Sequence, residues 1–311
     1  MNKIYQSKKF IVFIDWGTTN FRAYKFDLNK NKVGKKIQTN QGILKLRKSS
    51  EYIKIIKSIL RKFDLNEDQD ILMAGMVGSK KGLCEAPYVQ IPASLSKIAL
   101  NIFNKQILKQ KISIVPGLFY KKNNFYDVLR GEETLAIGAI NKFNKKTKYY
   151  LCCPGTHSKW MVIQKDMFLS FSSYMSGELY SAIANFTILA QSLNKSSSKI
   201  SEHYFTKGLK MIQTDQPISN TLFKVRTMDL FNQSNSNQCN SFLSGLIIGL
   251  EINYISKIKD LKKSSVILIA NGPLTKLYSI CFKFFKIKFS LVNADECFIR
   301  GMKKIYEANY K

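Results

Sequence analysis

Short runs of apolar residues alternate with segments of helical spacing along this chain of 311 residues. The runs Phe10–Ile14 and Ile71–Gly75 contain no charged side chain. Such runs are typical of strands that are buried on both faces of a sheet. Between them, Tyr52–Phe63 has apolar residues at helical spacing, with Lys and Arg on the other face. Two stretches of β-forming residues, Phe21–Asp27 and Lys32–Thr39, follow the first run, so the pattern predicts an α/β domain.

The same order of elements returns in the second half of the chain. Tyr149–Cys153 and Val266–Ala270 are apolar runs, and residues 159–173 between them predict a hairpin. Polar stretches at residues 192–201 and 232–240 predict loops on either side of a helical insertion. We therefore expect two similar α/β domains with a cleft between them. Their predicted bounds are residues 1–145 and 146–311, and the helical insertion covers roughly residues 190–240 of the second domain.

The composition favours a folded protein that carries an excess of positive charge. Hydrophobic residues make up 45% of the chain, which is enough for a sizeable core. The net charge of +28 is compatible with nucleic-acid binding or with a lysine-rich composition that has no special function. We favour the second interpretation and expect no nucleic-acid partner, because the basic residues are spread along the chain and no binding motif is present. The charge would still attract anionic substrates.

The cysteines and the apolar runs indicate the cellular compartment of the protein. None of the six Cys belongs to a C-x-x-C pair and only two His are present, so a structural zinc site is not expected. Most of the Cys lie in apolar stretches and are interpreted as reduced core residues. Phe10–Ile14 is too short for a signal peptide, and no apolar run approaches the length of a membrane span. We expect a cytoplasmic protein without membrane contact.

The turn after the first predicted strand, Asp15–Asn20, is a candidate phosphate-binding segment. Gly17 lets the backbone approach a ligand closely, and its amide and those of Thr18 and Thr19 can face phosphate oxygens. The two threonine hydroxyls are further donors. Asp15 ends a buried strand and is placed to hold a hydrated Mg²⁺ ion. The alternative interpretation of this segment is an ordinary Asp-Gly hairpin turn.

A second turn of the same kind follows the strand Tyr149–Cys153. Gly155 and Thr156 offer a flexible backbone and a hydroxyl, so two such turns can hold a polyphosphate from both sides. His157 lies in the same turn. Its side chain is interpreted either as a phosphate contact or as a structural residue that contacts protein groups alone. The stretch nearest to a Walker A sequence, Gly78–Gly82, lacks the required spacing.

Three segments resemble a known superfamily. Asp15–Thr19, Gly155-Thr156 and Asn271-Gly272-Pro273 are similar to the two phosphate segments and the adenosine segment of sugar kinases, hexokinase, Hsp70 and actin. The start of the chain, Asp15–Tyr24, more specifically resembles 2-dehydro-3-deoxygalactonokinases. Further blocks resemble that family in the family's order, namely Gly75–Ser79, Glu85–Val89, Arg130–Thr134, Pro154–Trp160, Met175–Leu179 and Ala270–Leu274.

This resemblance implies a fold and a reaction. The fold would consist of two RNase-H-like domains of the actin and hexokinase type. The reaction would be the ATP- and Mg²⁺-dependent phosphorylation of 2-dehydro-3-deoxy-D-galactonate to its 6-phosphate, in galactonate catabolism. The adenosine would lie against Asn271, Gly272 and Pro273. The alternatives are a kinase of the same fold for another small sugar acid or polyol, and a non-catalytic ATP-binding protein of the superfamily. The oligomeric state stays open, a homodimer included.

Two adjacent glutamates are candidates for the catalytic base. Phosphoryl transfer needs a group that orients the attacking hydroxyl and accepts its proton. Glu132 and Glu133 follow Gly131 at the predicted start of a helix, where glycerol-kinase-like relatives carry Gly-Asp. That similarity selects Glu132 first and Glu133 second. The alternative is that both glutamates only stabilise the helix dipole.

Candidate acceptor-binding residues lie near the ends of the predicted strands. Ser79 and Lys80 follow the strand Ile71–Gly75, at the edge where α/β sheets bind ligands. With Arg22, they are candidates for contacts to the carboxylate or a hydroxyl of the sugar acid. Lys80 is equally compatible with a solvated loop. Glu178 begins a predicted helix and is either a capping residue or a substrate contact.

Overall fold

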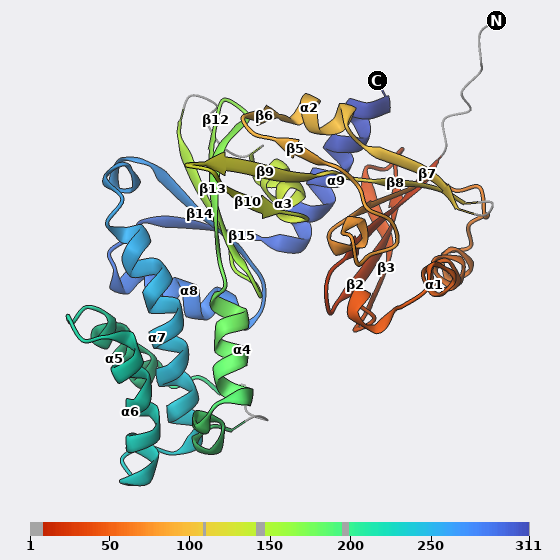
Figure 1. Cartoon of the computed structure of the whole chain (residues 1–311). Helices are drawn as coiled ribbons and strands as arrows, with labels where there is room; N and C mark the ends of the chain where they lie inside the picture. The colour runs from red at the N-terminus through yellow and green to blue at the C-terminus, as the bar shows by residue number, and fades with distance from the viewer. Residues whose placement is uncertain (1–8, 108–109, 141–146, 195–198, 311) are drawn as a thin grey trace, which may run out of the picture. The chain divides into compact units, whose positions relative to one another are not determined.

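The computed structural model describes residues 9–107, 110–140, 147–194 and 199–310 (Figure 1). The mixed α/β fold that the sequence predicts is confirmed. Contacts divide the chain into two compact units. The first comprises Met1–Phe143, Asp166–Ser170 and Asp295–Lys311, and the second comprises Asn144–Lys165 and Phe171–Ala294. This division and the predicted boundary after residue 145 differ in where they place residues 166–170 and 295–311.

The first unit is built on a sheet of order β3-β2-β1-β4-β8-β7. The central strand β1 pairs antiparallel with β2 and parallel with β4. The strands are β1 (Phe10–Trp16), β2 (Phe21–Asp27), β3 (Lys32–Thr39), β4 (Ile71–Ala74), β7 (Phe103–Ile107) and β8 (Gln110–Ile114). The apolar runs of the sequence are therefore the buried strands β1 and β4, as the pattern predicts.

Helices cover both faces of this sheet. Helix α1 (Ser49–Lys62) packs on the face that carries Trp16, whose ring lies 5.0 Å from that of Tyr52. On the other face, Phe298 of α9 (Ala294–Tyr310) lies 5.7 Å from Tyr24 of β2. The two contacts lie on opposite faces because side chains alternate along a strand. Helix α3 (Glu132–Ala139) packs closely against α9.

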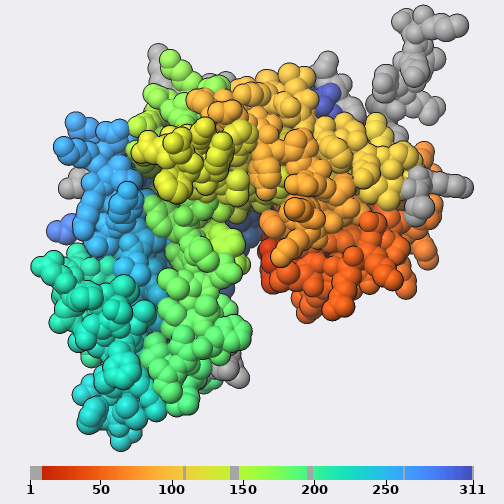
Figure 2. All heavy atoms as spheres, viewed as in Figure 1, coloured from red at the N-terminus to blue at the C-terminus, as the bar shows by residue number. Residues whose placement is uncertain are grey.

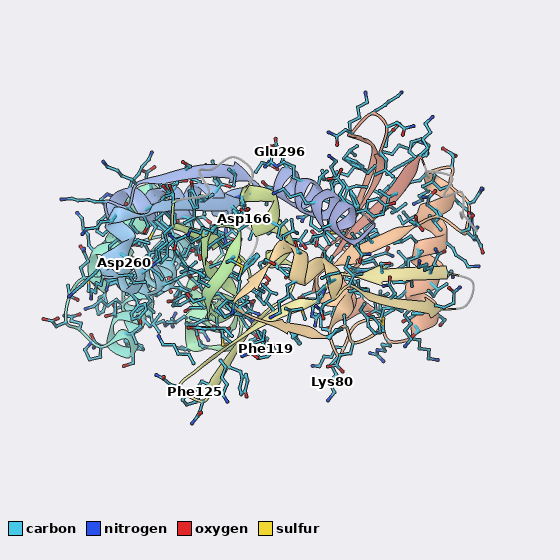
Figure 3. The ribbon with its side chains drawn as sticks, turned by 90° about the horizontal axis from the view of Figure 1, so that it is seen from above. Lys80, Phe119, Phe125, Asp166, Asp260 and Glu296 are labelled. Carbon is cyan, nitrogen blue, oxygen red and sulfur yellow. The ribbon has the colours of Figure 1, made fainter. Side chains whose placement is uncertain are left out.

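A small second sheet in the first unit has the order β10-β9-β5. It contains β5 (Tyr88–Gln90), β9 (Gly117–Lys122) and β10 (Phe125–Leu129), and β10 leads directly into the turn before α3. Phe125, at the start of β10, points away from the protein and is 81% exposed (Figure 3). Between β5 and β9 in the sequence lie β6 (Ala93–Ser94) and α2 (Leu95–Leu100), and β6 pairs antiparallel with Met167 and Phe168.

The sheet of the second unit repeats the central pattern of the first. β11 pairs antiparallel with β12 and parallel with β14, as β1 does with β2 and β4. The repeat predicted from the apolar runs is therefore present in the pairing of the strands. The strands are β11 (Tyr149–Cys153), β12 (Ser158–Gln164), β14 (Ser265–Ala270), β15 (Phe289–Asn293) and β13 (Met167–Tyr174), of which the residues up to Ser170 are assigned to the first unit.

Five helices pack beside this second sheet and on one another. Side chains of α4 (green) and of α5 and α6 (teal) fill the space that the ribbons leave between these helices (Figures 1 and 2). No helix in the described part of the chain combines the length and apolarity that a membrane span requires. The helices are α4 (Ser176–Phe186), α5 (Glu202–Ile212), α6 (Ile218–Leu230), α7 (Ser236–Ser256) and α8 (Pro273–Phe284).

Candidate active site

The first Gly-Thr turn joins β1 to β2. The amide of Gly17 donates to the carbonyl of Asn20 at 2.9 Å, which closes the turn. The carbonyls of Thr18 and Thr19 accept hydrogen bonds from the backbone of residues 42–44. The Gly17 amide thus holds the turn's shape, whereas we had expected it to face phosphate. Thr19 is exposed at the tip of the turn and Thr18 is half-buried.

Asp15 lies at the centre of a charge network within the first unit. Asp15 and Arg22 are register partners of β1 and β2, and the Nη1 atom of Arg22 donates to Oδ2 of Asp15 at 2.8 Å. Asp295 of α9 lies 4.0 Å from Nε of Arg22 and accepts a hydrogen bond from Lys36 at 2.6 Å. Burial raises the pKa of Asp15, and the charge of Arg22 opposes that shift. Arg22, predicted to contact the acceptor, is thus engaged with the predicted metal ligand.

Three backbone segments meet beside Asp15. Gly75, at the end of β4, has φ of 94°, a conformation that favours glycine. A Cβ atom at Gly75 would lie 2.9 Å from the carbonyl oxygen of Trp16 and 3.6 Å from Oδ1 of Asp15. A Cβ atom at Gly131, just before α3, would lie 3.3 Å from Cα of Gly75. The Asp15 carboxylate and the start of α3 therefore belong to one local site in the first unit.

The two candidate bases have different surroundings at the start of α3. Glu132 is half-buried, and its Oε2 accepts a hydrogen bond from the amide of Arg130 at 3.1 Å. Glu133 is fully buried and accepts hydrogen bonds from the amide of Gly131 at 2.7 Å and the hydroxyl of Thr134 at 3.1 Å. Burial and the charge of Glu132 raise the pKa of Glu133 to about 7. Only Glu132 retains exposed surface with which to meet a substrate.

The loop after β4 carries two predicted acceptor-binding residues, of which Ser79 is buried and Lys80 is exposed. The hydroxyl of Ser79, which is 9% exposed, donates to the carbonyl of Met76 at 2.7 Å and so closes a short 3₁₀ turn. Lys80 is exposed and points outward into solvent (Figure 3). Both residues lie in the first unit with Asp15, Arg22 and the two glutamates.

Arg130 is a buried residue of this region that the sequence did not single out. Its Nη2 donates to the carbonyl of Ala86 at 2.7 Å, and its guanidinium lies 4.2 Å from the ring centre of Tyr88. Arg130 thereby ties the loop after β4 and strand β5 to the turn that carries Glu132. The signal in the sequence is the Arg-Gly-Glu-Glu motif, in which Arg130 precedes the two candidate bases.

The second Gly-Thr turn, between β11 and β12, lies against the start of α4. A Cβ atom at Gly177 would lie only 2.4 Å from the carbonyl oxygen of Gly155, so this contact requires glycine. The amide of Glu178 donates to the carbonyl of Thr156 at 2.9 Å. The carboxylate of Glu178 lies 2.5 Å from Nε2 of His157, and both side chains are about half exposed. Glu178 therefore lies at the predicted phosphate turn of the second unit, whereas Arg22, Ser79 and Lys80 belong to the first unit.

A mainly apolar cavity of about 320 Å³ lies within the second unit. Both Gly155 of the predicted phosphate turn and Pro273 of the predicted adenosine turn line it. Its volume is within the range of small-molecule and nucleoside sites. Gly272, with φ of 62°, precedes α8, and the side chain of Asn271 accepts a hydrogen bond from the amide of Ala294 at 3.0 Å. Other lining residues include the apolar Ile247, Leu274 and Leu277 and the polar Ser176, Lys199 and Tyr278.

The sequence model of the 2-keto-3-deoxy-galactonokinase family matches residues 15–305. The chain belongs to this family. The match begins at Asp15 and includes both Gly-Thr turns, Glu132 and the Asn271-Gly272-Pro273 turn. The family predicted from the sequence blocks is therefore confirmed.

The names of two similar proteins agree with this membership. The chain is 30% identical over 302 residues to the 2-dehydro-3-deoxygalactonokinase of Escherichia coli (strain K12), covering 96% of this chain and 97% of that one. It is 29% identical over 291 residues to the probable 2-dehydro-3-deoxygalactonokinase DgoK1 of Rhizobium meliloti (strain 1021), covering 93% and 94% of the two chains.

Solved structures show the same fold. A crystal structure of a Sinorhizobium meliloti protein assigned to the 2-dehydro-3-deoxygalactonokinases superposes with a TM-score of 0.88 at 28% identity, over 96% of this chain and 99% of that one. The activator of 2-hydroxyisocaproyl-CoA dehydratase from Clostridium difficile, solved with bound ADPNP, superposes with a TM-score of 0.51 at 9% identity, over 96% and 95% of the chains. At that identity the second likeness concerns the fold alone.

Proposed function

We propose that this member of the 2-keto-3-deoxy-galactonokinase family transfers the terminal phosphoryl group of ATP to the terminal hydroxyl of 2-dehydro-3-deoxy-D-galactonate, giving the 6-phosphate. The observation that carries the proposal is the cavity that both Gly155 and Pro273 line. It joins the predicted phosphate turn and the predicted adenosine turn in one apolar pocket. The choice of acceptor rests on the names of the relatives in Escherichia coli and Rhizobium meliloti.

In this proposal the second unit binds the nucleotide. The adenosine enters the cavity and lies against Gly272 and Pro273, while Asn271 fixes the turn through its bond to Ala294. The phosphates meet Gly155 and Thr156. His157 and Glu178 act together beside them, so we place Glu178 at the phosphates and not at the sugar acid. The start of α4 lies on the same turn and contributes the positive end of its dipole.

A divalent cation fits the first unit at Asp15. Mg²⁺ in kinases is commonly held by one or two carboxylates together with water and substrate phosphates. Oδ2 of Asp15 is engaged by Arg22, and Oδ1 faces Gly75, where a side chain is excluded. When bound, the cation would offset the charge of the phosphates. Thr18 and Thr19 supply hydroxyls at the tip of the same turn, and Gly17 fixes its shape.

Glu132 is the proposed base. Its half-buried carboxylate lies in the same local site as Asp15 and can orient the acceptor's hydroxyl and accept its proton. Glu133 supports that turn from within the core. Lys80 is proposed to hold the acceptor's carboxylate, Ser79 closes the turn that precedes it, and Arg22 acts through Asp15. We place the reaction in the cytoplasm, where ATP is available and where the six free cysteines stay reduced.

An acceptor panel tests this proposal. ADP release would be measured with 2-dehydro-3-deoxy-D-galactonate, with D-galactonate and with glycerol, each at equal concentration. We expect release well above the acceptor-free rate only with the 2-dehydro-3-deoxy sugar acid. Release with another acid or polyol alone would keep the kinase class and refute the acceptor.

A further inference from the structure

A buried carboxylate lies behind the nucleotide cavity. Glu251 of α7 is 3% exposed and accepts four hydrogen bonds. Its Oε1 accepts from the hydroxyl of Ser158 at 2.7 Å and from the indole Nε1 of Trp160 at 2.6 Å. Its Oε2 accepts from the hydroxyls of Ser176 at 2.5 Å and Tyr278 at 3.0 Å. One side chain thus joins β12, α4 and α8 to α7.

The partners of Glu251 are the groups that shape the proposed nucleotide site. Ser158 directly follows the turn that contains Gly155 and His157. Ser176 and Tyr278 line the cavity, as does Gly155. The two oxygens of Glu251 therefore have separate neighbours. Oε1 faces the strand that leaves the proposed phosphate turn, and Oε2 faces the hydroxyls of two residues that line the cavity.

A purely structural role does not account for a carboxylate at this position. All four partners are neutral, and burial raises the pKa of Glu251 while the four hydrogen bonds act in the opposite direction. Burying a charge without an opposite charge is costly, and an apolar or amide side chain would avoid that cost. A carboxylate only accepts hydrogen bonds, whereas an amide both accepts and donates them.

We propose that Glu251 is a positioning residue for the nucleotide, an inference that rests on the proposed function. Because Ser176 and Tyr278 donate their hydroxyl hydrogens to the carboxylate, the oxygen lone pairs of these hydroxyls are left to accept hydrogen bonds from the cavity side. They then accept hydrogen bonds from hydroxyl or amino groups of the bound nucleoside. The same carboxylate fixes Ser158 and, with it, the end of the phosphate turn.

The substitution Glu251→Gln isolates this effect because its geometry is forced. The indole of Trp160 can only donate, so the glutamine carbonyl must face Trp160 and Ser158. The glutamine amide group then faces Ser176 and Tyr278, and both hydroxyls must turn to accept from it. The side chain keeps its volume and loses a buried charge, so we expect the variant to fold. The hydroxyls of Ser176 and Tyr278, however, change from donors to acceptors in their hydrogen bonds to residue 251.

The experiment compares the wild-type chain, Glu251→Gln and the control Glu202→Gln, which removes an exposed charge from α5 of the same unit. ATP affinity is measured by titration calorimetry, and thermal unfolding and the KM of both substrates are measured alongside. For Glu251→Gln we expect ATP binding to weaken and the KM for ATP to rise, each by about tenfold, as the loss of one or two neutral hydrogen bonds to the nucleoside predicts. The KM of the sugar acid should stay the same, and Tm should be unchanged or higher. Glu202→Gln should match the wild type.

A spectroscopic measurement adds a local signal. The chain has two Trp, so Trp16→Phe leaves Trp160 as the sole indole, hydrogen-bonded to Glu251. In that background ATP should change the emission of Trp160, and Glu251→Gln should reduce the change.

The possible failures are distinguishable. Unchanged ATP affinity in a folded Glu251→Gln variant would overturn the positioning role and leave the proposed function intact. If that variant does not fold, Ser176→Ala and Tyr278→Phe replace it, and wild-type ATP affinity in both would overturn the role equally. If the wild-type chain itself does not bind ATP, the proposed function fails and the positioning role fails with it.

Discussion

Arg22 donates a hydrogen bond from Nη1 to Oδ2 of Asp15 at 2.8 Å, across the register of β1 and β2. The sequence assigned the arginine to the acceptor and the aspartate to the metal. Their pairing makes Arg22 a partner of Asp15 instead, and Asp295 and Lys36 complete the charges around it. The electrostatic state of Asp15 therefore depends on Arg22.

Replacing Arg22 by Met should impair catalysis through Asp15. Burial raises the pKa of Asp15 and Arg22 opposes that shift, so the substitution raises this pKa further. We expect kcat/KM to fall by roughly 10- to 100-fold, as for other partners of metal ligands, and the acid limb of the pH profile to move to higher pH. The exposed Arg61→Met is the control. A loss of activity with an unmoved acid limb would contradict this account.

Glu132→Gln should reduce turnover without weakening ATP binding. The amide keeps the size of the side chain and cannot accept the acceptor's proton. We expect kcat to fall by about 10²- to 10⁴-fold, the usual contribution of a general base. Steady-state kinetics on this variant and on the exposed control Glu67→Gln would check it. Near-normal turnover in Glu132→Gln would remove this residue as the base.

Glu133 should make the stability of the protein depend on pH. Its pKa in the folded state is about 7, above its ordinary value of 4.5. A raised folded-state pKa means that the contribution to stability is full below about pH 4.5 and is lost as the pH rises through about 7. The loss between pH 5 and pH 8 is on the order of 3 kcal/mol.

Urea unfolding of Glu133→Gln at these two pH values measures this effect. The variant should lose less stability than the wild type between pH 5 and pH 8, because its side chain does not titrate. Glu296→Gln, at a side chain that is 63% exposed, should behave like the wild type. Parallel curves for wild type and Glu133→Gln would refute the raised pKa.

Gly177→Ala should weaken nucleotide binding by moving α4 away from the proposed phosphate turn. The added Cβ would lie 2.4 Å from the carbonyl oxygen of Gly155, which is too close for any real contact. We expect a loss of about 1–3 kcal/mol in stability, and a raised KM for ATP with little change in the KM of the sugar acid. Gly34→Ala has its nearest neighbour at 3.7 Å and serves as the control. Equal KM values for ATP in the two variants would contradict this role.

The sequence predicted the strands well because their signal is local. The apolar runs Phe10–Ile14 and Tyr149–Cys153 are central strands that must be buried on both faces, and the structure shows them as β1 and β11. The start of α7 was missed. Residues 232–240 were predicted as a loop because they are polar, but Asn235 and Gln238 form a capping box that begins the helix.

The side-chain contacts within the candidate site were harder to predict than the chain segments that form it. The turns containing Asp15 and Gly155 could be found from residue type and order alone. The charges around Asp15 include Asp295, which lies near the other end of the chain and is brought close by the packing of α9. Glu251 gave no signal because it lies in an apolar helix, and its role depends on four donors that are separated in sequence.

Identification of the product by phosphorus NMR tests the central claim most directly. The purified chain would be incubated with ATP, Mg²⁺ and 2-dehydro-3-deoxy-D-galactonate, and parallel samples would lack the sugar acid or the chain. We expect a new phosphomonoester signal to grow in step with ADP only in the complete mixture. Conversion of ATP to ADP and inorganic phosphate without that signal, or no consumption of ATP, would contradict the account.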